Sequence, residues 1–443
     1  MSVAFILSLV LIVGIMLLGV PVAYAFLWGS LFYLIISQDS LGAVVSTSFN
    51  SANAYAYLAI PLFVLAGRLM VTTTIAERLV ILAEVLLRKV KGGMGAAVIL
   101  AAAFFGTVTG SDIATATAVG NIMFPRMLRT GWDKRYIGAV LAAAAPLGYM
   151  IPPNTNAIMF SAITNVSVPA LFLSTIIPGI IWAILMFAIN RVMYKKYYHP
   201  ENADKSVKLE IKQREEKPDN AISEVKSAAY QAIPAIIMPV IILGGIYSGI
   251  FTSTEAGGVA GLYSILAGLV LFRTMSFKDT WKCFSDTSKD LGVIMFIVAT
   301  SAVFSRIMVL NKVPTMIATG MISISDNAII IMLIIDLIYL IAGCFLSPPV
   351  IMFVITPLLI PTARAIGLGD IQLGVMLFVS IGIGVITPPM AGNLFISARM
   401  AKCNVWDIVP PVMPYLLFAG IPVLLLVTFI PELSLFLPNL MGR

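Results

Sequence analysis

The chain has 443 residues, of which 60% are hydrophobic and only 11% are charged, and its formal net charge is +7. A soluble domain of this size needs charged side chains over its surface, so the composition excludes one and indicates a polytopic membrane protein. Cytoplasmic loops of membrane proteins collect Lys and Arg, which explains the basic balance without a nucleic-acid partner. The only histidine, His199, and three scattered cysteines predict neither a catalytic triad nor a Cys/His metal site.

Apolar stretches long enough to cross a hydrocarbon core of roughly 30 Å follow one another along the chain. The first half is predicted to hold five spans, at about 4–20, 22–37, 55–73, 136–165 and 170–190. The second half is predicted to hold five more, at about 229–249, 255–273, 291–309, 371–400 and 410–430. In each half the fourth span contains a proline pair and is predicted to break there, near residues 152 and 388. The first span lacks a basic start and a cleavage site, so we expect it to be retained.

Two further apolar stretches, 95–125 and 330–361, are interrupted midway by polar or turn-forming residues. We predict that each is a re-entrant helical hairpin, which enters the bilayer and returns to the same side. Amphipathic arm helices are expected just before them, at 75–91 and 311–326. The segment 191–228 holds nine basic and seven acidic residues and is expected to be a solvated cytoplasmic linker.

The two halves repeat each other at a spacing of 236 residues. Without a gap, this spacing aligns Ser111 with Ser347, Gly148 with Gly384, Pro152 with Pro388, and Pro153 with Pro389. Each half has an odd number of predicted crossings, so the second half is inverted relative to the first. The predicted fold is therefore an all-α polytopic membrane protein with an inverted-topology repeat of the elevator type. Residues 1–190 would form the first repeat, 191–228 the linker and 229–443 the second repeat.

The distribution of charge agrees with this topology. With the linker placed in the cytoplasm, the predicted inner segments hold 24 Lys and Arg residues. The predicted outer segments hold only three, Lys312, Arg364 and Arg443. Positive residues gather on the cytoplasmic side of membrane proteins, so the prediction has the expected asymmetry.

The two broken spans are the predicted binding region. Unpaired backbone groups are tolerated at membrane depth where they line a cavity. The carbonyl groups at the C-terminal end of a half-helix can bind a cation, and the N–H groups at the N-terminal end can bind an anion. We expect one sodium site where the first hairpin tip meets the first break, formed by Gly110, Ser111, Asp112, Pro152 and Asn154. A second is expected at the equivalent place, formed by Gly343, Ser347, Thr387, Pro388 and Met390. The organic anion is expected between them, bound by Asn154, Thr155, Asn156, Asn393 and Arg306.

Three charged residues fall at membrane depth: Asp112, Arg306 and Asp336. A buried charge costs at least a few kcal/mol there, so each is a candidate for function. Asp112 would ligate sodium or carry a proton. Arg306 lies near the outer end of its span, where it would bind the substrate or extend to the interface. Asp336 would pair with a neighbour or with a partner subunit.

Several motifs indicate a known family, and their order along the chain is specific to that family. They are Gly110-Ser111 with Ala114-Thr115-Ala116, Met123-Phe124-Pro125, Gly131-Trp132-Asp133, Ile151-Pro152-Pro153, Thr254-Glu255-Ala256, Thr356-Pro357-Leu358-Leu359 and Thr387-Pro388-Pro389. Over nearly its whole length the chain resembles the large membrane subunit of TRAP transporters. The resemblance implies an elevator-type importer of organic acids, driven by sodium, in the bacterial inner membrane. It also implies two partners, a separate small four-helix membrane subunit and an extracytoplasmic substrate-binding protein.

The chain departs from the family at five positions, two of which are Arg306 and Arg399, where the family usually has uncharged or small residues. The family usually has a serine where Asp112 stands, an aspartate where Ser347 stands, and a serine where Asn154 follows the proline pair. These departures argue for an altered anion, such as a sulfonate or a sugar acid, in place of the usual dicarboxylate.

Other functions are weighed against this one. A stand-alone sodium- or proton-coupled carboxylate symporter or antiporter of related architecture would need no partner subunit. A channel would not carry out saturable uptake against a gradient. An intramembrane enzyme is disfavoured by the single histidine of the linker, so the expectation is a secondary active transporter and not an enzyme.

Overall fold

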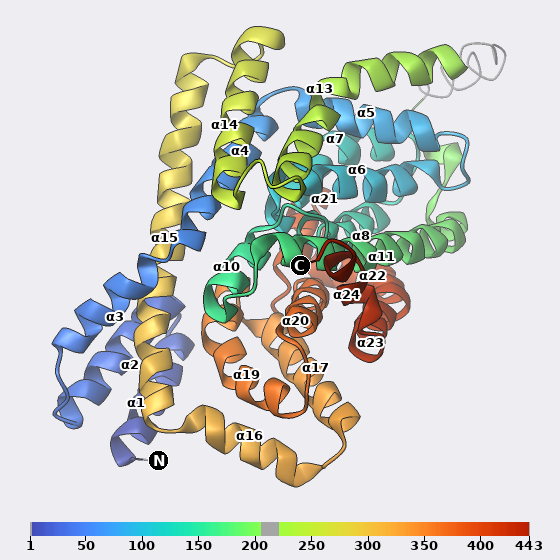
Figure 1. Ribbon diagram of the computed structural model, residues 1–443. Coiled ribbons are helices and arrows are strands. Elements are labelled where there is room, and N and C mark those ends of the chain that lie inside the picture. The colour runs from blue at the N-terminus through green and yellow to red at the C-terminus, as the bar shows by residue number, and fades with distance from the viewer. Residues whose placement is uncertain (1, 205–220, 443) are drawn as a thin grey trace.

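The computed structural model describes residues 2–204 and 221–442, which form helices joined by short connections (Figure 1). The first half contains α1 (Val3–Leu17), α2 (Val22–Ile36), α3 (Gly42–Ala52), η1 (Tyr55–Leu58), α4 (Ala59–Thr72), α5 (Ile75–Leu87), α6 (Gly93–Thr109), α7 (Asp112–Arg129), α8 (Lys134–Ala144), α9 (Leu147–Met150), α10 (Thr155–Thr164) and α11 (Val168–Tyr197). No β-strand occurs in the described residues, so the predicted all-α class is confirmed.

After a short turn, η2 (Pro200–Asn202), the second half follows the same plan. It contains α13 (Ala221–Tyr247), α14 (Ser253–Leu266), η4 (Ala267–Leu271), α15 (Phe277–Leu310), α16 (Val313–Ile324), α17 (Ala328–Phe345), α18 (Pro348–Val350), η5 (Ile351–Ile355), α19 (Thr356–Ala365), α20 (Asp370–Gly384), α21 (Gly392–Ala401), α22 (Val405–Tyr415), η6 (Leu416–Gly420), α23 (Ile421–Phe429) and α24 (Glu432–Leu440). Of the described helices, eight are long and apolar enough to cross a membrane, or nine if the bent α8–α10 segment counts as one.

The two hairpins and the two broken helices occur where the proline pairs and polar interruptions predict them. In the first half, α6 and α7 form the hairpin, and the helix pair Lys134–Met150 and Thr155–Thr164 bends by 46° at the break. In the second half, α17 and the α18–α19 segment form the hairpin, and α20 and α21 flank the break. The arms are also helices, and Figure 1 shows α5 at the top of the molecule and α16 at the bottom.

Several element boundaries differ from the sequence prediction. The stretch 38–54, expected to be a connection, contains α3, and α24 near the end of the chain was not expected. α15 begins at Phe277 and not near residue 291, because Ser276 and Asp279 form a capping box that starts the helix in the charged region. The 34 residues of α15 make it about 50 Å long, more than a bilayer core requires. Hydropathy locates the part of a helix that lipid covers, while the caps determine where the helix starts.

The predicted linker 191–228 is shorter than expected. α11 continues to Tyr197 and α13 begins at Ala221, so helices occupy both ends of the predicted segment. Its remaining part, 205–220, lies outside the described residues. Close to the linker, Asp133 and Arg135 form an ion pair at 2.7 Å, and Arg88 of α5 pairs with Glu224 of α13.

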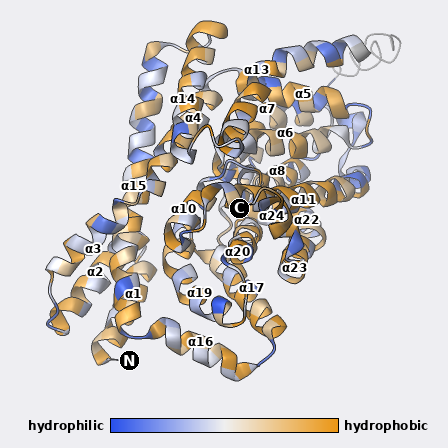
Figure 2. Cartoon of the chain, viewed as in Figure 1, coloured by the Kyte–Doolittle hydropathy of each residue, from blue (hydrophilic) through white to orange (hydrophobic). Residues whose placement is uncertain are grey.

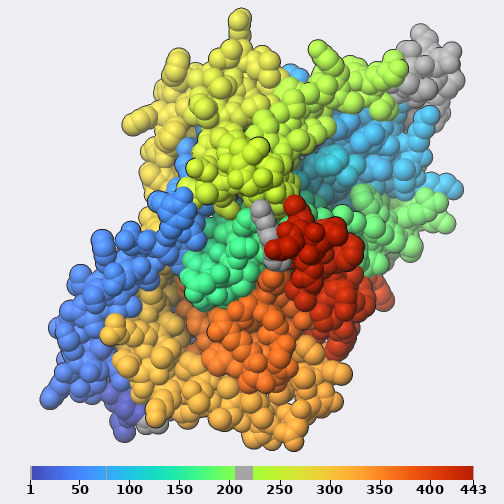
Figure 3. Space-filling model, viewed as in Figure 1, coloured from blue at the N-terminus to red at the C-terminus, as the bar shows by residue number. Residues whose placement is uncertain are grey.

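Two buried clusters organise the interior. The larger one joins both hairpins and both broken helices with α4, α5, α11, α13, α14 and α22–α23, and a smaller one joins α1, α2 and α15 with residues of the second hairpin. Hydrophobic residues cover most of the helices (Figure 2), as expected where lipid surrounds them. In the space-filling view, α10 reaches the surface between the helices of the two halves (Figure 3).

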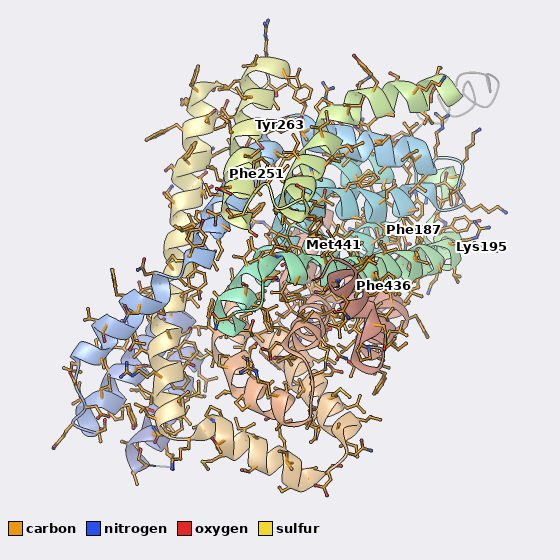
Figure 4. All side chains as sticks on the ribbon, in the orientation of Figure 1. Phe187, Lys195, Phe251, Tyr263, Phe436 and Met441 are labelled. Carbon is orange, nitrogen blue, oxygen red and sulfur yellow. The ribbon has the colours of Figure 1, made fainter. Side chains whose placement is uncertain are left out.

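The connection between α13 and α14 folds back onto α13 (Figure 4). The hydroxyl of Tyr263 donates to the carbonyl oxygen of Pro234 at 2.6 Å. The Phe251 ring lies so close to Gly245 that a Cβ there would be 2.2 Å from it. These contacts fix α14 beside α13, away from the broken helices.

Candidate functional site

The first hairpin turns at Gly110, whose backbone is left-handed with a φ of 57°. Ser111 then caps α7, its side chain accepting from the N–H of Ala114. At the first break α9 ends at Met150, and the peptide bond between Pro152 and Pro153 is cis. Asn154 caps the next half-helix, because its Oδ1 accepts from the N–H of Ala157 at 2.6 Å.

These two turns meet in a contact that we call the first hairpin–break contact, formed by Gly110, Ser111 and Thr115 with Gly148 and Pro153–Thr155. The Thr155 hydroxyl donates to the Gly110 carbonyl oxygen at 3.1 Å. A Cβ on Gly110 would lie 2.6 Å from the Pro153 carbonyl oxygen, and one on Gly148 would lie 2.9 Å from that of Ser111. Glycine is therefore required at both places, since each backbone lies directly against a carbonyl oxygen of the other segment.

Of the residues predicted for the first sodium site, the structure brings Gly110, Ser111 and Asn154 to this contact, with Pro152 buried beside it. Among the predicted substrate ligands, Asn156 is buried on α10 and Thr155 is occupied by its bond to Gly110. The Asn154 side chain is 1% exposed, and its Nδ2 has no hydrogen-bond partner among the described residues. A buried donor of this kind is available to an acceptor on a ligand.

The second hairpin–break contact is formed by Gly343 and Cys344 with Gly384 and Thr387. A Cβ on Gly384 would lie 2.4 Å from the carbonyl carbon of Gly343, so the backbones of α17 and α20 touch. The first half has the same kind of crossing, where a Cβ on Gly106 would lie 2.7 Å from the Cα of Gly148.

The predicted second sodium site is only partly assembled. Gly343 and Thr387 lie in the contact, but Thr387 already donates to the carbonyl oxygen of Ile383 at 2.6 Å. Pro388 is half-buried, Ser347 is exposed, and Met390 is 64% exposed. The second break is therefore exposed at the surface of the molecule in this structure, whereas the first break is buried.

Asp112, a predicted ligand of the first sodium site, stands at the hairpin tip with its side chain directed toward the half-helix after the second break. It is buried, and its Oδ2 accepts from the Nδ2 of Asn393 at 3.1 Å, across the two halves of the molecule. The Oδ1 of Asn393 is buried without a partner among the described residues. The tip of the first hairpin thus contacts the start of α21, the half-helix that follows the second break. The repeat alignment does not indicate this pairing.

The other two charged residues at membrane depth lie elsewhere. Arg306 is exposed, and its Nη1 donates to the Thr47 hydroxyl at 2.9 Å, so its side chain is directed toward α3. This placement does not support the predicted contact with the substrate. Asp336 is buried on α17 and pairs with Thr428 of α23, which is the first of the two alternatives expected for it.

Sequence reasoning missed a buried polar cluster at the start of each broken helix. The Tyr136 hydroxyl donates to the Oδ1 of Asn190 at 2.7 Å and contacts the Tyr415 hydroxyl. Gln372, which the spacing of 236 aligns with Tyr136, donates to the carbonyl oxygens of Val427 and Thr428. The repeat alignment could have revealed Tyr136 and Gln372, because it pairs two polar residues within apolar stretches.

Helical hairpins that face broken helices in two inverted halves define a class, the membrane transporters built from inverted repeats. Within that class, the chain belongs to the family described as "Tripartite ATP-independent periplasmic transporter, DctM component", whose model matches residues 9–433. The resemblance to TRAP transporters seen in the sequence is confirmed.

Relatives with named substrates match most of the chain. The C4-dicarboxylate TRAP transporter large permease protein DctM of Vibrio cholerae serotype O1 is 32% identical, with 98% of this chain and 97% of the relative covered. The sialic acid TRAP transporter large permease protein SiaM of the same organism is 29% identical, with 96% of each covered. The isethionate TRAP transporter permease protein DctMQ of Oleidesulfovibrio alaskensis is 29% identical over 95% of this chain but only 64% of the relative.

A solved structure shares the fold. The YdaH transporter of Alcanivorax borkumensis superposes with a TM-score of 0.59, covering 87% of this chain and 86% of the other. The sequence identity is 13%, so the likeness concerns the fold alone.

Proposed function

We propose that the chain is the translocating subunit of a sodium-coupled importer of a small organic anion in the bacterial inner membrane. An extracytoplasmic binding protein would deliver the anion, and a separate small membrane subunit would complete the transporter. Membership of the TRAP family supports the two partners.

The observation that carries sodium coupling is the first hairpin–break contact. The Gly110 carbonyl oxygen accepts from Thr155, the Pro153 carbonyl oxygen lies against Gly110, and the Ser111 carbonyl oxygen lies against Gly148, where two half-helices end and start. Unwound carbonyls and the C-terminal ends of half-helices are the groups that bind sodium in such transporters. A second sodium ion would bind at the second hairpin–break contact once Ser347 and Met390 close over it.

The anion would bind between the two contacts. Asn154 has an unused buried N–H donor, and Asn156 and Asn393 lie on the half-helices that follow the two breaks. Helix N-termini and amide donors suit an anion. The relatives are named for a dicarboxylate, for isethionate, which is a sulfonate, and for sialic acid, which is a sugar acid, so a small organic acid is the supported class.

Transport would follow an elevator cycle. The two hairpins and the two broken helices would move as a unit against the outer spans and the arms α5 and α16. The enclosed first break and the exposed second break suit one end of such a cycle. Sodium binding would favour loading, and its release inside would complete the cycle.

Thermal unfolding of the purified chain, with any subunit that co-purifies, tests sodium coupling. We expect a saturable rise in melting temperature in sodium, relative to potassium or choline at equal ionic strength. A ligand at 100 times its Kd stabilises the folded state by about 2.7 kcal/mol. Asn154→Ala and Thr387→Ala should each weaken the rise.

Two other outcomes would change the proposal. Absence of any sodium effect, with a pH effect that disappears in Asp112→Asn, would replace sodium coupling by proton coupling at Asp112. Full, saturable uptake by the chain alone, without a co-purifying subunit or a binding protein, would identify a stand-alone symporter or antiporter.

A further inference from the structure

The second hairpin contains a buried acid that the proposed function does not use. Asp336 lies in the middle of α17, is 3% exposed, and faces α23. Its Oδ2 lies 2.7 Å from the Thr428 hydroxyl oxygen. Its Oδ1 is buried and has no hydrogen-bond partner among the described residues.

The hydrogen-bond donors near Asp336 indicate whether its carboxyl group is protonated or ionised. Thr428 has one hydroxyl proton, but its oxygen lies near two acceptors, Asp336 at 2.7 Å and the Leu424 carbonyl at 2.8 Å. Both N–H groups of the neighbouring Gln372 are already used, on the carbonyl oxygens of Val427 and Thr428. The Tyr339 hydroxyl, one turn along α17, makes no hydrogen bond to the carboxyl group. An ionised carboxylate here would have at most one donor, and that donor is shared.

The helices packed around Asp336 also carry no positive charge that would stabilise its ionised carboxylate. No Lys, Arg or His stands on α17, η5, α20 or α23, the helices packed around the acid. The other titratable residues on these helices are Tyr339 and Cys344 of α17 and Asp370 of α20, which is ion-paired with Arg364 of α19 at 2.7 Å. A buried, unpaired carboxylate costs several kcal/mol, and such a group is neutralised instead.

Asp112 provides the contrast within the same chain. It lies in the first turn of α7, where free backbone N–H groups and the helix dipole favour a negative charge, and it receives the amide of Asn393. Asp336 has none of these features, since it lies two turns inside α17. Asp112 therefore has hydrogen-bond donors that an ionised carboxylate needs, whereas Asp336 lacks them.

We propose that Asp336 is a proton-binding site in the second hairpin, separate from both predicted sodium sites and occupied by a proton in this conformation. The carboxylic acid O–H donates to the Thr428 oxygen, and the Thr428 O–H donates to Leu424, so one proton on each group satisfies both bonds. When α17 separates from α23 and water reaches the acid, the proton passes to water and leaves a solvated carboxylate. The site would make movement of the second hairpin sensitive to pH.

Infrared difference spectroscopy of the full-length chain in lipid tests the proton directly. At neutral pH we expect the C=O stretching band of a protonated carboxylic acid, absent from Asp336→Asn and retained in Asp112→Asn, the matched control. The Asn side chain has nearly the same shape, and its N–H can replace the donated bond to Thr428. A wild-type spectrum without this band, or loss of the band in Asp112→Asn and not in Asp336→Asn, overturns the proposal.

Thr428→Val provides a second route if Asp336→Asn fails to fold. It removes the acceptor while leaving the acid, so the protonated band should persist and shift to the position of an unbonded acid. Disappearance of the band in Thr428→Val would mean that Asp336 is ionised, which is incompatible with the proposal. None of these spectra depends on transport, so failure of the sodium-coupled function and failure of the proton site are distinguishable.

The pH dependence of thermal stability gives an independent readout. A group that holds its proton more tightly when folded contributes stability that is present at low pH and lost as pH rises. We expect the melting temperature of the wild type to fall more steeply than that of Asp336→Asn as pH rises from about 4, near the pKa of an aspartyl group in the unfolded chain, to neutral. Equal slopes in the two proteins contradict the proposal.

Discussion

Asn154 uses only one of its two side-chain groups within the chain. Its Oδ1 caps α10, and its Nδ2 is buried without a partner among the described residues. An unsatisfied buried donor costs about 1–3 kcal/mol, which is tolerated where a ligand supplies the acceptor. The free group is a donor, so it suits the anion better than a sodium ion, although the sequence assigns Asn154 to both.

Two substitutions of Asn154 separate its capping role from a direct role in sodium binding. Asn154→Ala should lower stability without sodium by about 1 kcal/mol, since the cap is lost, and should weaken the sodium-dependent rise in melting temperature. Asn154→Ser keeps a capping oxygen and should restore both values. If Asn154→Ser restores stability but not the sodium effect, the amide itself binds the ion.

At the scale of elements, the two hairpins are held against the broken helices by close backbone crossings. Gly106 and Gly148 in the first half, and Gly343 and Gly384 in the second, leave no room for a Cβ. Small residues allow helix backbones to touch in a membrane, where burial of apolar side chains gives little driving force. The crossings thus position the hairpin tips beside the breaks.

Gly384→Ala should destabilise the chain by about 1–3 kcal/mol, because the new methyl group meets the backbone of Gly343 at 2.4 Å and a backbone cannot rotate away. Gly261→Ala in α14 is the matched control, since no atom lies within 4 Å of the place that its Cβ would occupy. The control should be neutral or stabilising by up to about 1 kcal/mol. Thermal unfolding of both variants measures the difference, and equal melting temperatures would refute the role of the crossing.

At the scale of the whole molecule, the arrangement agrees with an inverted repeat. α5 and α16 lie at opposite ends of the molecule in Figure 1. Basic residues are concentrated in the segments assigned to the cytoplasm, with 24 inside against three outside. Ion pairs join α7 to the α5 arm at the end of the molecule assigned to the cytoplasm. Arg126 of α7 contacts Glu77 and Glu84 of α5 at 3.2 and 2.9 Å.

Cysteine labelling in intact cells tests this orientation. In a background with the three native cysteines replaced by serine, Lys312→Cys should react with a membrane-impermeant maleimide added outside. Lys402→Cys and Lys289→Cys should react only after the cells are made permeable. None of the three positions is buried, so access through the membrane decides the result. The reverse pattern would invert the topology.

The sequence by itself determined the all-α class, the two hairpins, the two helix breaks and the family. Each of these follows from composition or from residues close together in the chain, such as Pro152–Pro153, or from the repeat that aligns them with Pro388–Pro389. Helix limits were less accurate at α3 and α15, because caps and amphipathic segments there do not follow hydropathy.

Which side chains meet across the two halves follows from the packing of the helices. Asp112 pairs with Asn393, Asp336 pairs with Thr428, and Arg306 is directed toward α3. Helices that are apolar on nearly every face carry little information about which face meets which neighbour, since lipid and protein interior are equally apolar. The partner of a buried charge in a membrane therefore depends on how the helices pack, which the order of residues along one helix does not reveal.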